Sequence, residues 1–107
     1  MTLRVILTAR AKDALHDSAQ WWAEHRSLEQ AVRWYDGFLD ALDSLREQPN
    51  RCPLAREHRR FPYEIRELHY GLGSRPTHRA IFTIRPDAVL VLTVRHAAQG
   101  DIEPGDL

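Results

Sequence analysis

The stretch that decides the fold is residues 65–95, which reads IRELHYGLGSRPTHRAIFTIRPDAVLVLTVR. Three short runs within it are rich in apolar and β-branched residues, as strands are: Ile65–Tyr70, His78–Ile84 and Ala88–Arg95. The turn Arg85-Pro86-Asp87 is too short for a parallel crossover, so the last two runs must pair as antiparallel strands. The stretch therefore predicts a mainly antiparallel sheet.

The side-chain pattern of these runs predicts how the sheet is covered. Ala88–Val94 is apolar at six of seven positions, which is typical of a central strand buried on both sides. The alternation in residues 63–70 changes phase, so we expect a β-bulge near Arg66-Glu67. The middle run divides between two faces: Ala80, Phe82 and Ile84 on one, Arg79, Ile81 and Thr83 on the other.

Upstream of this sheet, the sequence predicts one more strand and two helices. Leu3–Leu7 is a short β-branched strand, and Thr8 caps a helix over Ala9–His25 whose apolar residues recur with a 3.6-residue period. Residues 27–30 form a capping box that starts a second helix, which Pro49 ends. Because at most two residues join the helices, they fold back as a hairpin. We therefore expect an α+β fold of order β-α-α-β-β-β, with a helical hairpin packed on a twisted, mainly antiparallel sheet of about four strands.

Gly37 lies inside the second predicted helix, where glycine costs about 1 kcal/mol relative to alanine. One interpretation is that it makes room for Trp21 or Trp22 of the first helix; the other is a tolerated surface glycine. These two tryptophans and Trp34 lie at core spacing on the helices, so we expect them to pack rather than to stack on nucleic-acid bases.

Composition restricts the class of protein. The 107 residues suit a single domain, residues 1–107, with one modest core. No apolar run approaches the roughly 20 residues that cross a bilayer, and the N-terminus lacks a signal-peptide pattern, so no membrane association is expected. The lone Cys52 forms no internal disulfide and fits a cytoplasmic location. None of the six histidines has a close paired spacing and the single cysteine stands alone, so no metal is expected. No cofactor is expected either.

The net charge is zero but is unevenly distributed. Residues 49–99 hold nine arginines against four acids, whereas the acidic tail, about residues 100–107, holds three acids. Arginine suits bidentate contact with phosphate, which points to an anionic ligand, although a GC-rich genome would also enrich arginine. The tail is expected to shield the arginine face in the free protein. The predicted nucleic-acid-binding residues are Arg56, Arg59, Arg60 and Arg95.

Short motifs along nearly the whole chain resemble the RelE/ParE superfamily of type II toxin–antitoxin toxins. They are, in order, Val5-Ile6-Leu7-Thr8 with Ala11, Asp13 and Leu15; Leu45-Arg46-Glu47-Gln48-Pro49; Arg66-Glu67-Leu68; His78-Arg79-Ala80-Ile81-Phe82; and Val89–Val94 with His96. The resemblance covers residues 3 to about 99. It implies a cognate antitoxin protein as partner, in a toxin–antitoxin hetero-oligomer.

The superfamily has two branches that differ in target. Resemblance to the RelE-like branch implies a ribosome-dependent endoribonuclease that cuts mRNA; resemblance to the ParE-like branch implies a DNA gyrase poison without nuclease chemistry. A third possibility is a decayed toxin that only binds its antitoxin. The chain has one lysine, and no aromatic residue follows Phe82, whereas several nuclease toxins carry site lysines and a terminal tyrosine. The retained arginines and histidine favour mRNA cleavage slightly, whereas the missing terminal tyrosine and the long helical hairpin favour gyrase inhibition.

RNA cleavage needs cations at the phosphate together with an acid and a base. The predicted catalytic residues are Arg66 and Arg79 as cations and His96 as acid or base, since histidine titrates near neutral pH. The hypothesis requires these three side chains to converge on one anion-receiving hollow. The remaining acid–base role is left open among Glu57, Glu64, Glu67 and His69.

Structural roles are the alternative for the same residues. Arg66 and Arg79 would then pair with Glu64 or Glu67 as sheet-face ion pairs, and His96 would cap its strand or bind the acidic tail.

Overall fold

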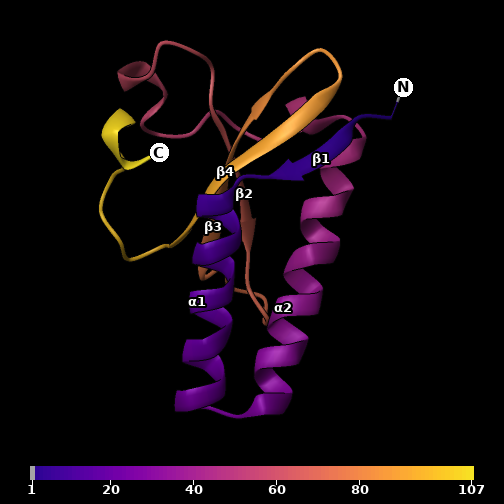
Figure 1. Cartoon of the computed structure of the whole chain (residues 1–107), viewed down its shortest axis with the longest axis vertical. Helices are drawn as coiled ribbons and strands as arrows, with labels where there is room; N and C mark the ends of the chain where they lie inside the picture. The colour runs from indigo at the N-terminus through magenta and orange to yellow at the C-terminus, as the bar shows by residue number, and fades with distance from the viewer. Residues whose placement is uncertain (1) are drawn as a thin grey trace.

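The structure is a computed structural model that describes residues 2–107, and its element order matches the prediction (Figure 1). The helices are α1 (Ala9–His25) and α2 (Leu28–Asp43), and the strands are β1 (Arg4–Leu7), β2 (Arg66–Tyr70), β3 (His78–Ile84) and β4 (Ala88–His96). Short 3₁₀ turns lie at Ser44–Arg46, Pro49–Arg51, His58–Arg60 and Pro104–Asp106. Within residues 2–107, no helix is long and apolar enough to cross a membrane.

The four strands form one mixed sheet in the order β1-β4-β3-β2. β1 runs parallel to β4, while β4, β3 and β2 pair antiparallel, so the predicted mainly antiparallel sheet is confirmed. The α1–α2 hairpin packs along the sheet, with the two helices running antiparallel (Figure 1).

The β-bulge lies elsewhere than predicted. The β2–β3 register runs without a break from Arg66 opposite Phe82 to the far end of β2, so the bulge expected at Arg66-Glu67 is wrong. The register shift falls between β3 and β4, where Ile81 pairs with Thr93 and Phe82 with Val91. Leu92 is thus the extra residue, and it moves every later β4 residue by one position relative to β3.

Both helix starts are fixed by the predicted N-cap residues, but of the capping box expected at residues 27–30 only the serine half is present. The Thr8 hydroxyl oxygen accepts a hydrogen bond from the Ala11 N–H at 3.1 Å, and the hydroxyl donates to the Leu92 carbonyl oxygen at 3.0 Å. The Ser27 hydroxyl oxygen accepts from the Gln30 N–H at 3.1 Å. Thr8 therefore both caps α1 and attaches its start to the central strand β4.

The helix-facing side of the sheet holds the larger, apolar core. Its aromatic centre is ordered by direct ring contacts: Trp34 and Phe38 meet edge to face with centroids 5.3 Å apart, and Phe38 stacks on Tyr70 at 4.6 Å. The largest fully buried side chains of this core are Trp34, Phe38, Phe82, Leu15, Leu42 and Leu45.

Gly37 is required by a strand tyrosine, not by the tryptophans proposed above. A Cβ atom at Gly37 would meet the hydroxyl of Tyr70 directly and lie 3.2 Å from its Cζ atom. Because Tyr70 is stacked on Phe38, its ring has little freedom to move aside. Gly37 therefore lets β2 approach α2.

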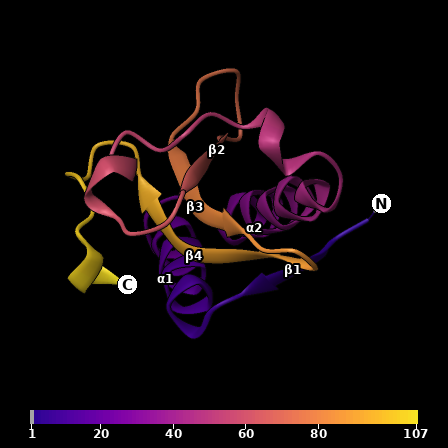
Figure 2. The same cartoon turned by 90° about the horizontal axis from the view of Figure 1, so that it is seen from above.

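The opposite side of the sheet, which we call the outer face, holds a second core formed by loop and tail. It contains Ala55, Phe61, Ile65, Ile81 and Ile102, all at most 9% exposed. Figures 1 and 2 both place the C-terminal segment beside the turn at His58–Arg60. The segment predicted only as an acidic tail thus supplies a fully buried isoleucine to the fold.

Candidate functional site

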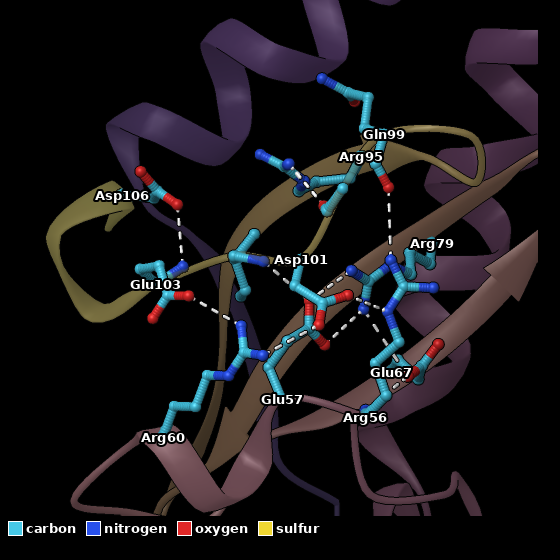
Figure 3. Close-up of polar contacts among 12 residues, drawn as sticks. Arg56, Glu57, Arg60, Glu67, Arg79, Arg95, Gln99, Asp101, Glu103 and Asp106 are labelled. Atoms are coloured by element: carbon cyan, nitrogen blue, oxygen red, sulfur yellow. Dashed lines mark hydrogen bonds and ion pairs between the residues drawn. The ribbon is translucent and has the colours of Figure 1, made fainter.

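Arg79 extends from β3 onto the outer face, where it is 3% exposed. Its guanidinium donates from both terminal nitrogens to the carboxylate of Glu57, with Nη1 to Oε1 at 2.8 Å (Figure 3). Glu67 lies close to the same group, with Oε1 3.6 Å from Nη1. A buried cation must be neutralised at short range, and these two acids do so.

Glu57 is the centre of this network, and it is 1% exposed. Besides Arg79, it accepts a hydrogen bond from the Ile102 backbone N–H at 2.9 Å. Burial alone would raise the pKa of Glu57, but the hydrogen bonds from Arg79 and Ile102 outweigh burial and hold the pKa at about 2. Glu57 therefore remains ionised near neutral pH and joins the sheet to the C-terminal segment.

Arg66 lies on the edge strand β2, away from Arg79. Its guanidinium donates to Glu64 Oε1 at 3.0 Å and to the Cys52 carbonyl oxygen at 2.6 Å. Arg66 pairs with Phe82 of β3, and paired residues point to the same face of the sheet. Phe82 is three residues from Arg79, and side chains alternate along a strand, so the side chains of Arg66 and Arg79 leave the sheet on opposite faces. Arg66 attaches the loop after α2 to the sheet edge.

His96 ends β4 directly opposite His78, the first residue of β3. Its Nδ1 accepts a hydrogen bond from the Ala98 N–H at 3.0 Å, and its backbone N–H donates to Gln99 Oε1 at 2.7 Å. Its neighbour Arg95 pairs with Arg79, so His96 lies on the other face of the sheet from Arg79. The predicted capping role of His96 is confirmed.

The three predicted catalytic residues therefore do not converge: Arg79 is sealed under the outer face, Arg66 binds a loop, and His96 closes a turn on the opposite face. The alternative of structural ion pairs is confirmed for both arginines, since Glu64 pairs with Arg66 and Glu67 with Arg79. The candidate bases are engaged as well. Glu67 accepts from the Arg56 backbone N–H at 3.1 Å and lies 2.6 Å from Nε2 of His69.

No pattern in the sequence indicates that His96 lies next to a second imidazole. The rings of His78 and His96 are 5.0 Å apart at one side of a cleft of about 490 Å³. Burial, followed by the proximity of His96, lowers the pKa of His78 to about 4, so His78 is neutral near pH 7. The cleft is lined by Asp17, Ser18, Trp21, Trp22, Arg26, Thr77, His78 and His96.

The tryptophans divide between core and surface. Trp34 is fully buried, as predicted, but Trp21 is 46% exposed in this cleft and stacks on His25 at 4.7 Å. The packing prediction is therefore wrong for Trp21. Among residues 2–107, its exposed indole is one of five large apolar side chains that reach the surface.

Three of the four predicted nucleic-acid-binding arginines, Arg56, Arg60 and Arg95, lie against the C-terminal segment (Figure 3). Arg56 Nε and Arg60 Nη2 both reach Asp101, at 2.6 Å and 3.3 Å, and Arg60 Nη1 reaches Glu103 at 2.7 Å. Arg95 Nη2 donates to the Gly100 carbonyl oxygen at 2.7 Å. Arg59, the fourth, is exposed. The expected shielding by the acidic tail is thus present as direct ion pairs.

No group of three or more histidine, cysteine, aspartate or glutamate side chains within residues 2–107 is arranged to hold a metal ion.

Comparison with known proteins identifies the family to which this chain belongs. A family model described as the ParE toxin of the type II toxin–antitoxin system parDE matches residues 5–100, so the chain belongs to the ParE toxin family. No curated protein matches the chain. Among solved structures, the chain is similar to one from the chromosomal ParDE toxin–antitoxin system of P. aeruginosa. The match has a TM-score of 0.70 and 16% identity, and it covers 89% of this chain and 96% of that chain.

Proposed function

We propose that this toxin inhibits growth by binding DNA gyrase, without cutting RNA, and that a cognate antitoxin neutralises it in the cytoplasm. Membership of the ParE family supports this target, because the ParE-like branch is the one expected to poison gyrase. The antitoxin partner follows from the same family and from the similarity to a ParDE system.

The observation that carries the proposal is the burial of Arg79 and its pairing with Glu57. A guanidinium that stabilises a cleaved phosphate must reach it, yet Arg79 is 3% exposed and both its terminal nitrogens are bound by Glu57. Opening this pair would leave a buried carboxylate unpaired, which is strongly unfavourable. The predicted nuclease set therefore lacks a cation that its hypothesis requires.

Ribosome-dependent mRNA cleavage is the second candidate, and one observation favours it. His96 and His78 lie together in a cleft that also contains Arg26 and the exposed indole of Trp21. Two imidazoles beside a guanidinium provide acid, base and cation groups of the kind that RNA cleavage uses. The low pKa of His78 weakens it as an acid–base group near pH 7.

The two candidates are separated by assaying the purified toxin in parallel against gyrase and against ribosomes carrying mRNA. We expect loss of DNA supercoiling and accumulation of broken DNA, with mRNA left intact. His96→Ala should reduce gyrase inhibition only modestly. Prompt mRNA cuts that disappear by orders of magnitude in His96→Ala would establish the nuclease and reject the gyrase proposal. Inactivity in both assays, with antitoxin binding retained, would identify a decayed toxin.

A further inference from the structure

A carboxylate of the C-terminal segment is held between two arginines on the outer face. Asp101 binds Arg56 through one oxygen and Arg60 through the other, and Arg60 also binds Glu103 (Figure 3). Arg59 lies next to Arg60 along the chain, is exposed, and forms no ion pair within the described part of the chain. Arg56 and Arg60 share one anion, and the exposed Arg59 lies in the same turn as Arg60, so this segment presents cationic groups whose anion-binding positions are already occupied by the chain's own carboxylates.

The C-terminal segment is attached by two separable kinds of contact. Ile102 is fully buried in the outer-face core, and its N–H is bound by Glu57. The carboxylates on either side of it are exposed: the side chain of Asp101 retains 37% and that of Glu103 60% of its accessible surface. Exposed ion pairs contribute little to stability, so the carboxylates can leave the arginines while Ile102 stays in place.

The chemistry left exposed after such a release defines the ligand. Ile102 stays buried, so where Asp101 and Glu103 leave, a partner would meet the guanidiniums of Arg56 and Arg60. Arginine forks bind phosphate oxygens in the same way as carboxylate oxygens. A ligand that offers repeated negative charge and no apolar anchor fits best, and the backbone of duplex DNA has this character.

We propose that Arg56, Arg59 and Arg60 form a binding site for DNA phosphates, and that Asp101 and Glu103 occupy it in the free toxin as an internal competitor. The site adds a second ligand to the proposed function, because gyrase acts on DNA and the toxin would contact both. It does not depend on gyrase being the target.

The test compares the binding of two charge-matched variants of the full chain to a short duplex DNA over a range of salt concentrations. Asp101→Asn/Glu103→Gln frees the arginines, whereas Asp36→Asn/Asp40→Asn removes the same charge from the exposed side of α2. We expect the first variant to bind about tenfold more tightly than the parent toxin at 0.1 M salt. The slope of log K against log salt concentration should become steeper by the amount that corresponds to about two additional phosphate contacts. The α2 variant should gain about twofold, through net charge alone.

Adding Arg56→Gln/Arg60→Gln to the first variant should abolish the gain. Equal gains in the two charge-matched variants, or no gain in the first, would overturn the proposal. If the double variant fails to fold, Asp101→Asn alone makes the same comparison against Asp36→Asn. Gyrase inhibition by the parent toxin is measured separately. If the parent toxin does not inhibit gyrase but the first variant gains DNA affinity, the proposed function is rejected and the DNA site is retained.

Discussion

The two faces of the sheet are filled in different ways. The helix-facing side is closed by two helices whose periodic apolar residues pack on β3 and β4, with Trp34, Phe38 and Phe82 fully buried. The outer face is closed by a loop and the C-terminal segment around a buried ion pair between Glu57 and Arg79. One sheet therefore combines an apolar core with a core that depends on a charged pair.

This difference explains why the arginines of the sheet suggested a ligand site. An arginine on an apolar strand needs an anion, and the sequence does not say whether that anion is a substrate or a carboxylate of the same chain. On the outer face the anion is Glu57, which the loop between α2 and β2 brings to Arg79. The buried charge is thus part of the scaffold.

The largest expected effect comes from breaking the charged pair. Glu57→Gln leaves the Arg79 cation buried beside a neutral amide, which should lower the free energy of unfolding by about 3–5 kcal/mol. Chemical denaturation measures the loss. Glu64→Gln, which disturbs the more exposed pair with Arg66, is the control and should cost less than about 1 kcal/mol. Equal losses would remove the distinction between a buried and an exposed network.

Removing the apolar anchor of the C-terminal segment should cost about 3 kcal/mol. Ile102→Ala deletes a fully buried side chain from the outer-face core and leaves a cavity. Leu28→Ala, at a position that is 72% exposed, is the control and should be almost neutral. A small effect of Ile102→Ala in denaturation experiments would mean that the outer face does not rely on this segment.

Acidification should destabilise the edge of the helix-facing core through His78. Its pKa falls from about 6.5 to about 4 on folding, so the unfolded chain binds the proton more readily and stability decreases as pH falls through this range. Between pH 7 and pH 5 the expected loss is about 2 kcal/mol. Glu57 contributes its own loss only below about pH 4.5, where the unfolded glutamate becomes protonated. His78→Asn should flatten the stability profile between pH 5 and pH 7, and an unchanged slope would assign it to other groups.

The smallest predicted effect is a reversal of sign at Gly37. Glycine to alanine inside a helix usually stabilises by up to about 1 kcal/mol, but the new Cβ meets the Tyr70 hydroxyl. We expect Gly37→Ala to destabilise by about 1 kcal/mol, because close-packed cores do not accommodate an added methyl group easily. In a Tyr70→Phe background the same change should become neutral or stabilising. If Gly37→Ala instead raised the free energy of unfolding while Tyr70 is present, β2 would have to move away to make room for the new methyl group.

The fold could be predicted because its signals are local. Caps at Thr8 and Ser27, helical periodicity and the tight turn after β3 each depend on residues close in sequence, and each was found where expected. The site depends on contacts between distant residues. Glu57 and Arg79 are 22 positions apart, and Glu57 and Ile102 are 45 apart, so no spacing rule joins them.

One misplaced bulge shows how a local error moves a site. Ile84 pairs with Val89 at the turn, so an unbroken hairpin would place His78 opposite Arg95. The extra residue Leu92 shifts the register and brings His96 to His78 instead. The two-histidine cleft therefore depends on one bulge that the sequence pattern suggested on a different strand.

The central claim is that Arg79 supports the fold and takes no part in toxicity. The most direct measurement expresses Glu57→Leu/Arg79→Met without antitoxin and follows growth arrest and gyrase supercoiling. Replacing both charges by apolar side chains of similar size should leave the protein folded, because neither Glu57 nor Arg79 is left as an unpaired charge, although the Ile102 N–H loses its acceptor and Glu67 loses its contact with Arg79. We predict that the folded variant arrests growth and inhibits gyrase as the parent toxin does. A folded variant that has lost toxicity would contradict the claim and would show that the Glu57–Arg79 pair is needed for toxicity.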